Sequence, residues 1–140
     1  ALAENNRVKT DYDTRPPVIF NILSEVESSE IGKDGKGQMI ISFETDEPST
    51  AQIEYGLGST GETYGNKSQE DSGLSTSHVV IVNGLRSSSS YQFRIISKDA
   101  SGNISYSEAQ PIITEQAQTS VLDIVINSFR NSIGWMFKEK

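Results

Sequence analysis

The chain has 140 residues, of which 34% are hydrophobic and 22% are charged, and its formal net charge is -7. This length and composition are typical of one folded domain with appendages. The acidic balance argues against nucleic acid, whose binding depends on neutralising phosphates. The lack of cysteine excludes disulfides, thiolate metal ligands and a cysteine nucleophile.

Residues 1–16 are polar and charged, without a sustained hydrophobic period, and we interpret them as an extended N-terminal arm. The arm ends at Pro16 and Pro17, which disfavour a helix and favour an edge strand after them. Ala1-Leu2-Ala3 matches the end of a signal peptide. A numbering that starts inside a longer precursor explains the same residues equally well. Many Ser, Thr, Asn and Gly residues also suit an exported protein, so we expect a cell-surface or extracellular location.

Between residues 17 and 115, short alternating segments are separated by turn-forming residues. A period of two places Met39, Ile41 and Phe43 on one face of a strand. Seven such strands at this spacing predict an antiparallel β-sandwich, in which Tyr91 buries its ring and bonds its hydroxyl to the backbone of the preceding turn. The predicted strands are 18–22, 38–45, 50–56, about 63–64, 77–82, 91–98 and about 104–114, with a long loop at 24–37 and turns at 46–49, 83–84 and 99–103.

Several motifs of this region resemble one protein family. They are Thr45-Asp46-Glu47-Pro48 running on to Ala51-Gln52-Ile53-Glu54-Tyr55-Gly56, then Asn83-Gly84-Leu85, Tyr91-Gln92-Phe93-Arg94-Ile95 and Asp99-Ala100-Ser101-Gly102-Asn103. In combination they make the region similar to a fibronectin type III domain, most of all to the variant found in secreted and surface proteins of bacteria and ahead of some extracellular hydrolases. Phe43 departs from the pattern, because the family usually has tryptophan there. The resemblance implies an immunoglobulin-like sandwich over residues 17–115 of an exported bacterial protein, and no reaction.

After Glu115 the hydrophobic period changes from two to that of a helix. Thr119 or Ser120 can cap a helix, and Asp123 lies favourably in its first turn. We therefore predict one C-terminal amphipathic α-helix within residues 116–140. Its apolar face is the expected interaction surface, formed by Val121, Leu122, Val125, Ile126, Phe129, Ile133, Trp135, Met136 and Phe137.

The apolar face of this predicted helix needs a surface to cover it. Three surfaces remain open: the chain's own sandwich or that of a neighbouring copy, a different protein, and a membrane surface. For the last, Trp135, Phe137, Lys138 and Lys140 resemble an interfacial end. Within the chain, the strand pattern turns Ile40, Val79 and Ile81 away from the predicted core. We expect these three residues to form an outer sheet patch on which the helix of the same or another subunit docks.

Candidate catalytic residues are few. His78 is the only histidine, and adjacent Ser77 faces the opposite side of a strand, so a structural hydrogen bond is favoured over a Ser-His-Asp site. The neighbouring carboxylates at 46–47 and 70–71 favour turns, because a glycosidase needs two carboxylates across a cleft. Acidic loops offer oxygen ligands for calcium without EF-hand spacing; they contain Asp34, Asp46, Glu47 and Asp71. We assign no catalytic, cofactor-binding or metal-binding residue.

The sequence therefore predicts a non-catalytic extracellular module rather than an enzyme. We expect a structural or interaction role, as a subunit or accessory domain of a cell-surface or extracellular assembly that docks on a protein partner or a second copy through its C-terminal helix. Two alternatives remain. The chain is an adhesion module that binds glycans or proteins through loops 24–37 and 56–75, or it is the accessory domain of a secreted hydrolase. No cofactor is expected.

Overall fold

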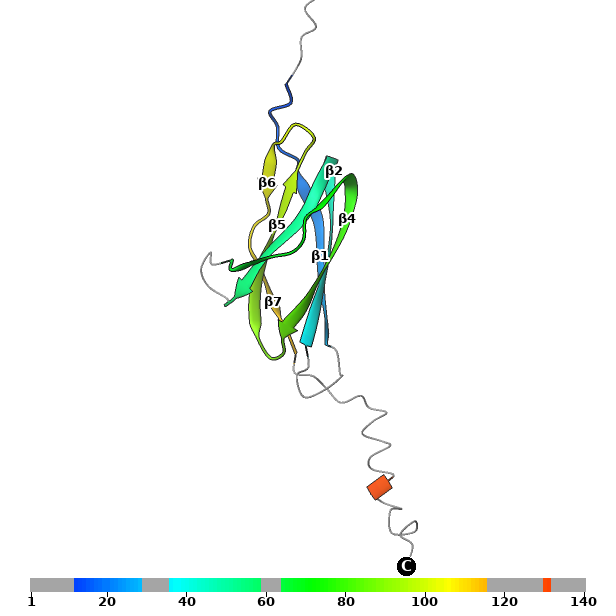
Figure 1. The fold of residues 1–140 in the computed structure, drawn as a ribbon, viewed down its shortest axis with the longest axis vertical. Coiled ribbons are helices and arrows are strands. Elements are labelled where there is room, and N and C mark those ends of the chain that lie inside the picture. Colours follow the sequence, from blue (N-terminus) through cyan, green and yellow to red (C-terminus); the bar gives the residue numbers. More distant parts are fainter. Residues whose placement is uncertain (1–11, 29–35, 59–63, 116–129, 132–140) are drawn as a thin grey trace, which may run out of the picture.

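A computed structural model describes residues 12–28, 36–58, 64–115 and 130–131. Within these ranges seven β-strands form one connected antiparallel sheet, which curls on itself (Figure 1). The strands are β1 (Ile19–Ser28), β2 (Lys36–Leu57), β3 (Asn66–Lys67), β4 (Asp71–Arg86), β5 (Ser90–Lys98), β6 (Ile104–Tyr106) and β7 (Gln110–Ile113).

β2 is long enough to belong to both halves of the curled sheet. Up to Thr45 it pairs with β1 on one side and with β4 on the other. From Gln52 onward it pairs with β5, which in turn pairs with β6 and β7. We call β1, β4 and the first part of β2 the first half of the sheet, and the remaining strands with the second part of β2 the second half.

The curl brings the inward side chains of both halves into one hydrophobic cluster. The first half contributes Met39, Ile41 and Phe43, and the second half contributes Phe93 and Ile95, all of them buried. The alternation predicted for residues 39–43 is therefore confirmed. Because strand side chains alternate between faces, the same register leaves the intervening residues of β2 on the outer face.

Tyr91 behaves as the sequence predicts. Its ring is buried in the cluster, and its hydroxyl accepts a hydrogen bond from the backbone N–H of Arg86 at 2.8 Å. Arg86 is the last residue of β4, and the turn to β5 follows it. The tyrosine therefore joins the end of the first half to the second half.

The predicted fold class, a seven-stranded sandwich followed by one C-terminal helix, is wrong. Residues 46–49 were expected to be a turn between two strands, but β2 passes through them without a break, so that one curled sheet contains both halves. The hydroxyls of Thr45 and Ser49 both donate to the carbonyl of Glu47, at 2.9 and 2.7 Å. These bonds keep the segment extended, and Pro48 falls between two ladder pairings where no ladder donor is needed.

No helix is an element of the described residues. Of residues 116–140 only Arg130 and Asn131 are described, so the predicted helix otherwise lies outside the described ranges. A helical period is not sufficient for a helix, because most helix stability in proteins comes from packing of the apolar face.

Strand ends also differ from the prediction. β1 continues to Ser28, into the predicted loop, and β4 begins at Asp71 rather than at residue 77. Asn83 and Gly84 lie inside β4, although Gly84 has a φ of 78°. The tight turn comes later, at Ser87 and Ser88, where Ser88 adopts a φ of 49°. A serine run can thus provide the left-handed residue that the Asn-Gly pair was expected to supply.

The described end of the N-terminal arm is fixed to the sheet. The guanidinium of Arg15 lies 2.7 Å from the carboxylate of Asp46, whose other oxygen accepts the N–H of Val18. The side chain of Asn103 donates to the carbonyl of Asp13 at 2.8 Å. Residues 13–18 therefore lie across one end of both halves.

Candidate functional site

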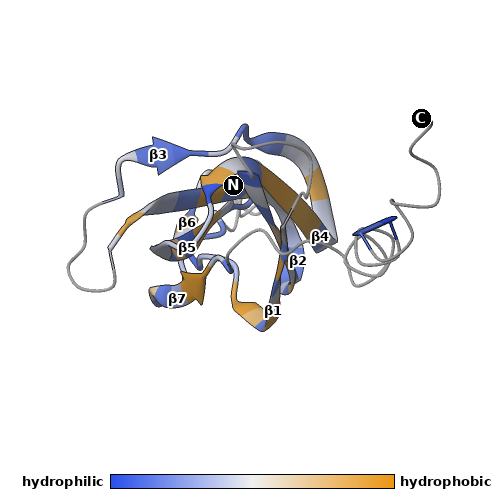
Figure 2. Cartoon of the chain, turned by 90° about the horizontal axis from the view of Figure 1, so that it is seen from below, coloured by the Kyte–Doolittle hydropathy of each residue, from blue (hydrophilic) through white to orange (hydrophobic). Residues whose placement is uncertain are grey.

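The outer face of the first half carries exposed apolar side chains. Val79 is 66% exposed and Ile81 is 52% exposed, while Ile40 is half-buried and lies directly opposite Ile81 in the ladder. The structure thus brings together the three residues of the predicted outer sheet patch. Figure 2 shows the apolar colour of this part of β4.

A fourth residue, Leu23, belongs to the same surface and was not predicted. It pairs with Ser42, which on its other side pairs with Val79, and it is 69% exposed. Leu23, Ser42 and Val79 therefore form one row across three strands. We call Leu23, Ile40, Val79 and Ile81 the outer-face cluster.

A β-bulge explains why Leu23 faces outward. The ladder between β1 and β2 shifts register between Phe20 and Leu23, and Asn21 has a φ of 51°. The extra residue lets Ile19 and Ile22, three positions apart, both pack on the core, and it leaves Leu23 on the outside. Asn tolerates this left-handed backbone better than most residues, and its amide also bonds to the Glu44 carboxylate. Asn21 was therefore the residue in the sequence that could have indicated the bulge.

An open groove of about 650 Å³ lies at one end of this surface. Three consecutive residues from each of the three strands line it: 21–23 of β1, 42–44 of β2 and 77–79 of β4. Leu23 and Val79 are its exposed apolar members. The groove is therefore a recess in the outer face, with apolar side chains on two of its strands.

The rim of the outer-face cluster is acidic. Glu25 pairs with Ile40, Glu27 pairs with Gln38, and Glu44 pairs with Phe20. Glu25 and Glu27 are exposed, and all three belong to a chain with a net charge of -7. An apolar centre with an acidic rim favours partners that carry apolar side chains flanked by Lys or Arg.

The other predicted interaction surface cannot be placed. The residues of the predicted helix face all lie outside the described residues. They are Val121, Leu122, Val125, Ile126, Phe129, Ile133, Trp135, Met136 and Phe137.

His78 has a structural environment. It is 6% exposed, its ring stacks on Phe43 with centroids 4.5 Å apart, and its Nε2 lies 3.1 Å from the hydroxyl of Thr45. Burial lowers the pKa of the imidazole, although the charge of Asp71 and a bond to the Ser75 backbone oppose that effect. A neutral ring that fills the core and bonds to Thr45 is the role that this arrangement supports.

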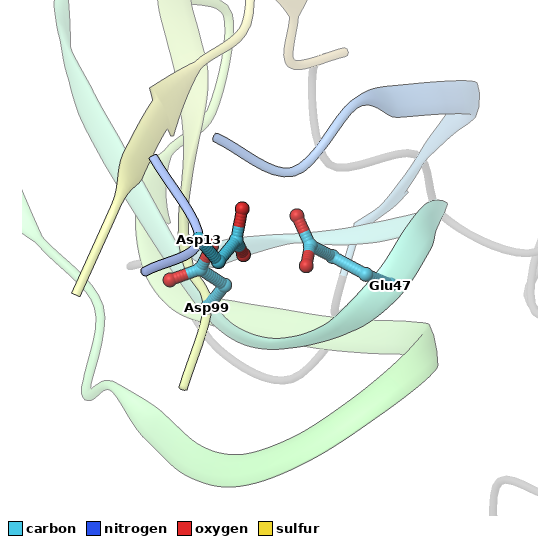
Figure 3. A group of neighbouring side chains, drawn as sticks. All are labelled: Asp13, Glu47 and Asp99. Atoms are coloured by element: carbon cyan, nitrogen blue, oxygen red, sulfur yellow. The ribbon is translucent and has the colours of Figure 1, made fainter. Parts of the chain in front are cut away.

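Three carboxylates from distant parts of the chain meet at one end of the sheet (Figure 3). Asp13, Glu47 and Asp99 each have an oxygen within 4.8 Å of the others. Of the residues considered for calcium, only Glu47 belongs to this group. Asp46 instead binds Arg15, Asp71 begins β4, and Asp34 lies outside the described residues.

The three carboxylates differ in electrostatic environment. Burial, and then the charges of Asp13 and Asp99, raise the pKa of Glu47, whose Oε1 is buried without a hydrogen-bond partner among the described residues. Burial also opposes ionisation of Asp99, but hydrogen bonds from Asn103 and Ser101 outweigh it and lower the pKa of Asp99. Carboxylate oxygens are ligands that hard cations prefer, yet Asp99 also stabilises its own turn, which is a role that needs no ion.

The second half carries a charged and aromatic cluster on its outer face. Arg94 donates to Glu54 at 2.6 Å, and its guanidinium lies over the rings of Tyr64 and Tyr106, at 4.7 and 4.5 Å from their centroids. Burial would raise the pKa of Glu54, but hydrogen bonds from Arg94 and Lys67 lower it. Tyr106 is exposed, so the two halves present chemically different outer faces.

Comparison with protein-family models and with curated proteins finds no match for this chain. The resemblance to fibronectin type III domains therefore stays a prediction. In the described ranges, no helix has the length and apolar character needed to span a bilayer.

Proposed function

We propose that this chain is a non-catalytic structural or interaction module that docks on another protein through the outer-face cluster. The module serves as a subunit or accessory domain of an extracellular or cell-surface assembly. The location rests on the sequence resemblance to secreted and surface proteins, and the docking surface rests on the geometry of the first half.

One observation carries the proposal: Leu23, Val79 and Ile81 lie on the same face and are each more than half exposed. Single exposed apolar residues are normal, but contiguous ones mark interaction sites. Covering one such side chain completely contributes about 1.5–3 kcal/mol before ordering costs. The free energy gained when a partner covers the whole cluster therefore offsets part of the entropy that is lost on association.

The negative charge of the rim indicates the chemistry of the partner. Glu25 and Glu27 project from β1 beside the cluster, so a protein segment with Lys or Arg next to apolar side chains fits best. Rim charges accelerate association and exclude wrongly charged partners more than they add affinity. Binding should therefore be faster at low ionic strength.

A peptide selection tests the proposal without knowledge of the natural partner. Random peptides displayed on phage are selected on the full chain, and the enriched peptides are synthesised and titrated. We expect apolar sequences flanked by Lys or Arg, with affinity that falls about tenfold or more in Ile81→Lys, which places a charge inside the contact.

Ile104→Lys is the matched control, because Ile104 is an exposed isoleucine of the second half. Peptides that bind this variant as well as the wild type, and Ile81→Lys poorly, support the proposal. Peptides that bind both variants equally, or a selection that enriches none, contradict it.

Glycan or protein binding by the second half is the other candidate function. It is favoured by the exposed ring of Tyr106, which stacks on Arg94 beside Tyr64 from the predicted binding loop 56–75. Tyrosine rings with charged neighbours suit a polar ligand that has an apolar face. A glycan array with wild type and Tyr106→Ala decides: signals that disappear in the variant support this candidate, and an array without signals excludes glycans.

A further inference from the structure

We propose that Asp13, Glu47 and Asp99 bind one calcium ion at the end of the sheet where the N-terminal arm lies across both halves. The three carboxylates come from separate segments: Asp13 from the arm, Glu47 from the middle of β2, and Asp99 from the position directly after β5. None of them belongs to the outer-face cluster or lines its groove. The calcium site is therefore separate from the docking surface, and its test is independent of the peptide selection.

The spacing of the three carboxylates suits one calcium ion. Figure 3 shows the side chain of Glu47 pointing from β2 toward Asp13, which lies next to Asp99. One oxygen of each carboxylate is within 4.8 Å of the other two. Calcium binds oxygen at about 2.3–2.6 Å, so two oxygens on the same ion are separated by at most about 5 Å. Magnesium binds at about 2.0–2.1 Å and requires a tighter set of oxygens.

Hydrogen bonds hold the three residues in place without an ion. Ser49 donates its hydroxyl to the carbonyl of Glu47 at 2.7 Å, and it forms a bridge with Asp99, which brings Asp99 beside this part of β2. The side chain of Asn103 donates both to the carbonyl of Asp13, at 2.8 Å, and to the carboxylate of Asp99, at 3.0 Å. Because the ligands are already assembled, binding an ion requires little reordering of the chain.

The carboxylates lack a positive partner, and one oxygen lacks any partner. Each ion pair of the described ranges involves other carboxylates, and the nearby Arg15 is paired with Asp46. Oε1 of Glu47 is buried and accepts no hydrogen bond from the described residues, which is a costly state for a carboxylate oxygen. Burial and the charges of Asp13 and Asp99 raise the pKa of Glu47. A bound cation supplies both the missing partner and the missing charge.

The number of protein ligands sets the expected affinity. Calcium takes six to eight oxygens, so three carboxylates leave several positions to water, and Asp13 is exposed. Such sites resemble those of extracellular modules, whose dissociation constants are about 10⁻⁴–10⁻³ M. The bound ion joins the arm, through Asp13, to β2 and to the turn after β5.

Titration calorimetry of the full chain with calcium chloride tests the proposal. The chain is first freed of metal with a chelator and is measured in about 0.15 M KCl, which screens unspecific attraction to a net charge of -7. We expect one calcium ion per chain, with a dissociation constant in the range given above. Glu47→Gln and Asp13→Asn should each weaken binding about tenfold or more. Both variants leave the hydrogen bonds of the Asp99 carboxylate to its own turn intact, so the fold is preserved.

Glu25→Gln is the matched control, because it makes the same chemical change at an exposed carboxylate of β1. It should bind calcium within about twofold of wild type. An absence of saturable binding, or binding that Glu47→Gln and Asp13→Asn both retain, would overturn the proposal. In the first case Glu47 and Asp13 satisfy each other by sharing a proton, and in the second the ion lies elsewhere.

Urea unfolding gives a second readout, which reports on the folded protein. Calcium at ten times its dissociation constant should lower the equilibrium constant for unfolding about tenfold in wild type and in Glu25→Gln. In Glu47→Gln the same calcium concentration should lower it less than about twofold. Equal stabilisation of all three proteins would contradict a site at Glu47.

Discussion

Tyr91 shows how one polar atom connects the two halves of the sheet. Its ring packs among apolar side chains while its hydroxyl satisfies the N–H of Arg86 at the end of β4. Thr114 acts in a similar way from the other side, because its hydroxyl donates to the carbonyl of Arg86 and accepts from the N–H of Ser89. Part-buried hydrogen bonds of this kind contribute modestly to stability, but leaving the donor without an acceptor is costly.

We predict that Tyr91→Phe keeps the fold and lowers the free energy of unfolding by about 1–2 kcal/mol, since the ring remains and the Arg86 N–H loses its acceptor. Urea unfolding measures the difference. Tyr106→Phe, at an exposed tyrosine, is the control and should change stability by less than about 0.5 kcal/mol. An equal loss in the two variants would show that the hydroxyl of Tyr91 has no special role.

Glu47 makes stability depend on pH in an unusual direction. Its carboxyl has a raised pKa because of burial and the neighbouring charges of Asp13 and Asp99. A folded-state pKa above the unfolded value means that the folded protein binds the proton more tightly, so stability is lost as pH rises through that range. Asp99 has the opposite effect on the pH dependence of stability. Because its pKa is lowered in the folded state, the stability that it contributes is lost as pH falls.

We therefore predict that the stability of Glu47→Gln relative to wild type increases as pH rises from about 4 to about 7. The stability of Asp99→Asn relative to wild type should instead increase as pH falls through the acidic range, because this variant lacks the hydrogen-bonded carboxylate. Urea unfolding at several pH values measures both. A constant difference between Glu47→Gln and wild type across the range would show that Glu47 ionises normally.

At the scale of elements, the bulge of β1 decides which side chains reach the outer face. Asn21 adopts a φ of 51° and shifts the ladder, so that Ile22 packs on the core and Leu23 stays outside. Without the extra residue, the alternation of β1 would reverse beyond this point. Both the core contact and the outer-face cluster depend on it.

Asn21→Val is predicted to lower the free energy of unfolding by about 1–2 kcal/mol or more, because a β-branched residue is strained at positive φ. Asn21→Gly is the matched control: it also loses the bond to Glu44 but accepts the backbone angle. The difference between the free energies of unfolding of the two variants, measured in urea, isolates the cost of backbone strain at position 21. Equal stability would mean that the bulge is not needed.

Alternation along the strands was predictable from the sequence, and the long-range features were not. The period of two correctly placed Met39, Ile41 and Phe43 in the core, because it depends only on the geometry of a strand. The turn expected at 46–49 failed, since the hydroxyls of Thr45 and Ser49 hold that segment extended. Leu23 was missed because the predicted strand ended at residue 22, whereas β1 continues through a bulge to Ser28. Asp13, Glu47 and Asp99 are far apart in the chain, and only the tertiary fold brings them together.

At the scale of the whole molecule, one curled sheet presents two unlike outer faces. The first half shows apolar side chains within an acidic rim, and the second half shows the Arg94 cluster with its ion pairs and tyrosines. The inward side chains of both halves pack in the same buried core. The fold therefore holds the proposed docking surface in a fixed position on the first half.

The most direct test of the docking surface is a methyl NMR titration of the full chain with a selected peptide. We predict shifts concentrated at Leu23, Ile40, Val79 and Ile81, with Leu57 and Ile104 unchanged. Shifts centred on Leu57 or Ile104, or spread evenly over the molecule, would contradict the claim that the outer-face cluster is where this protein binds.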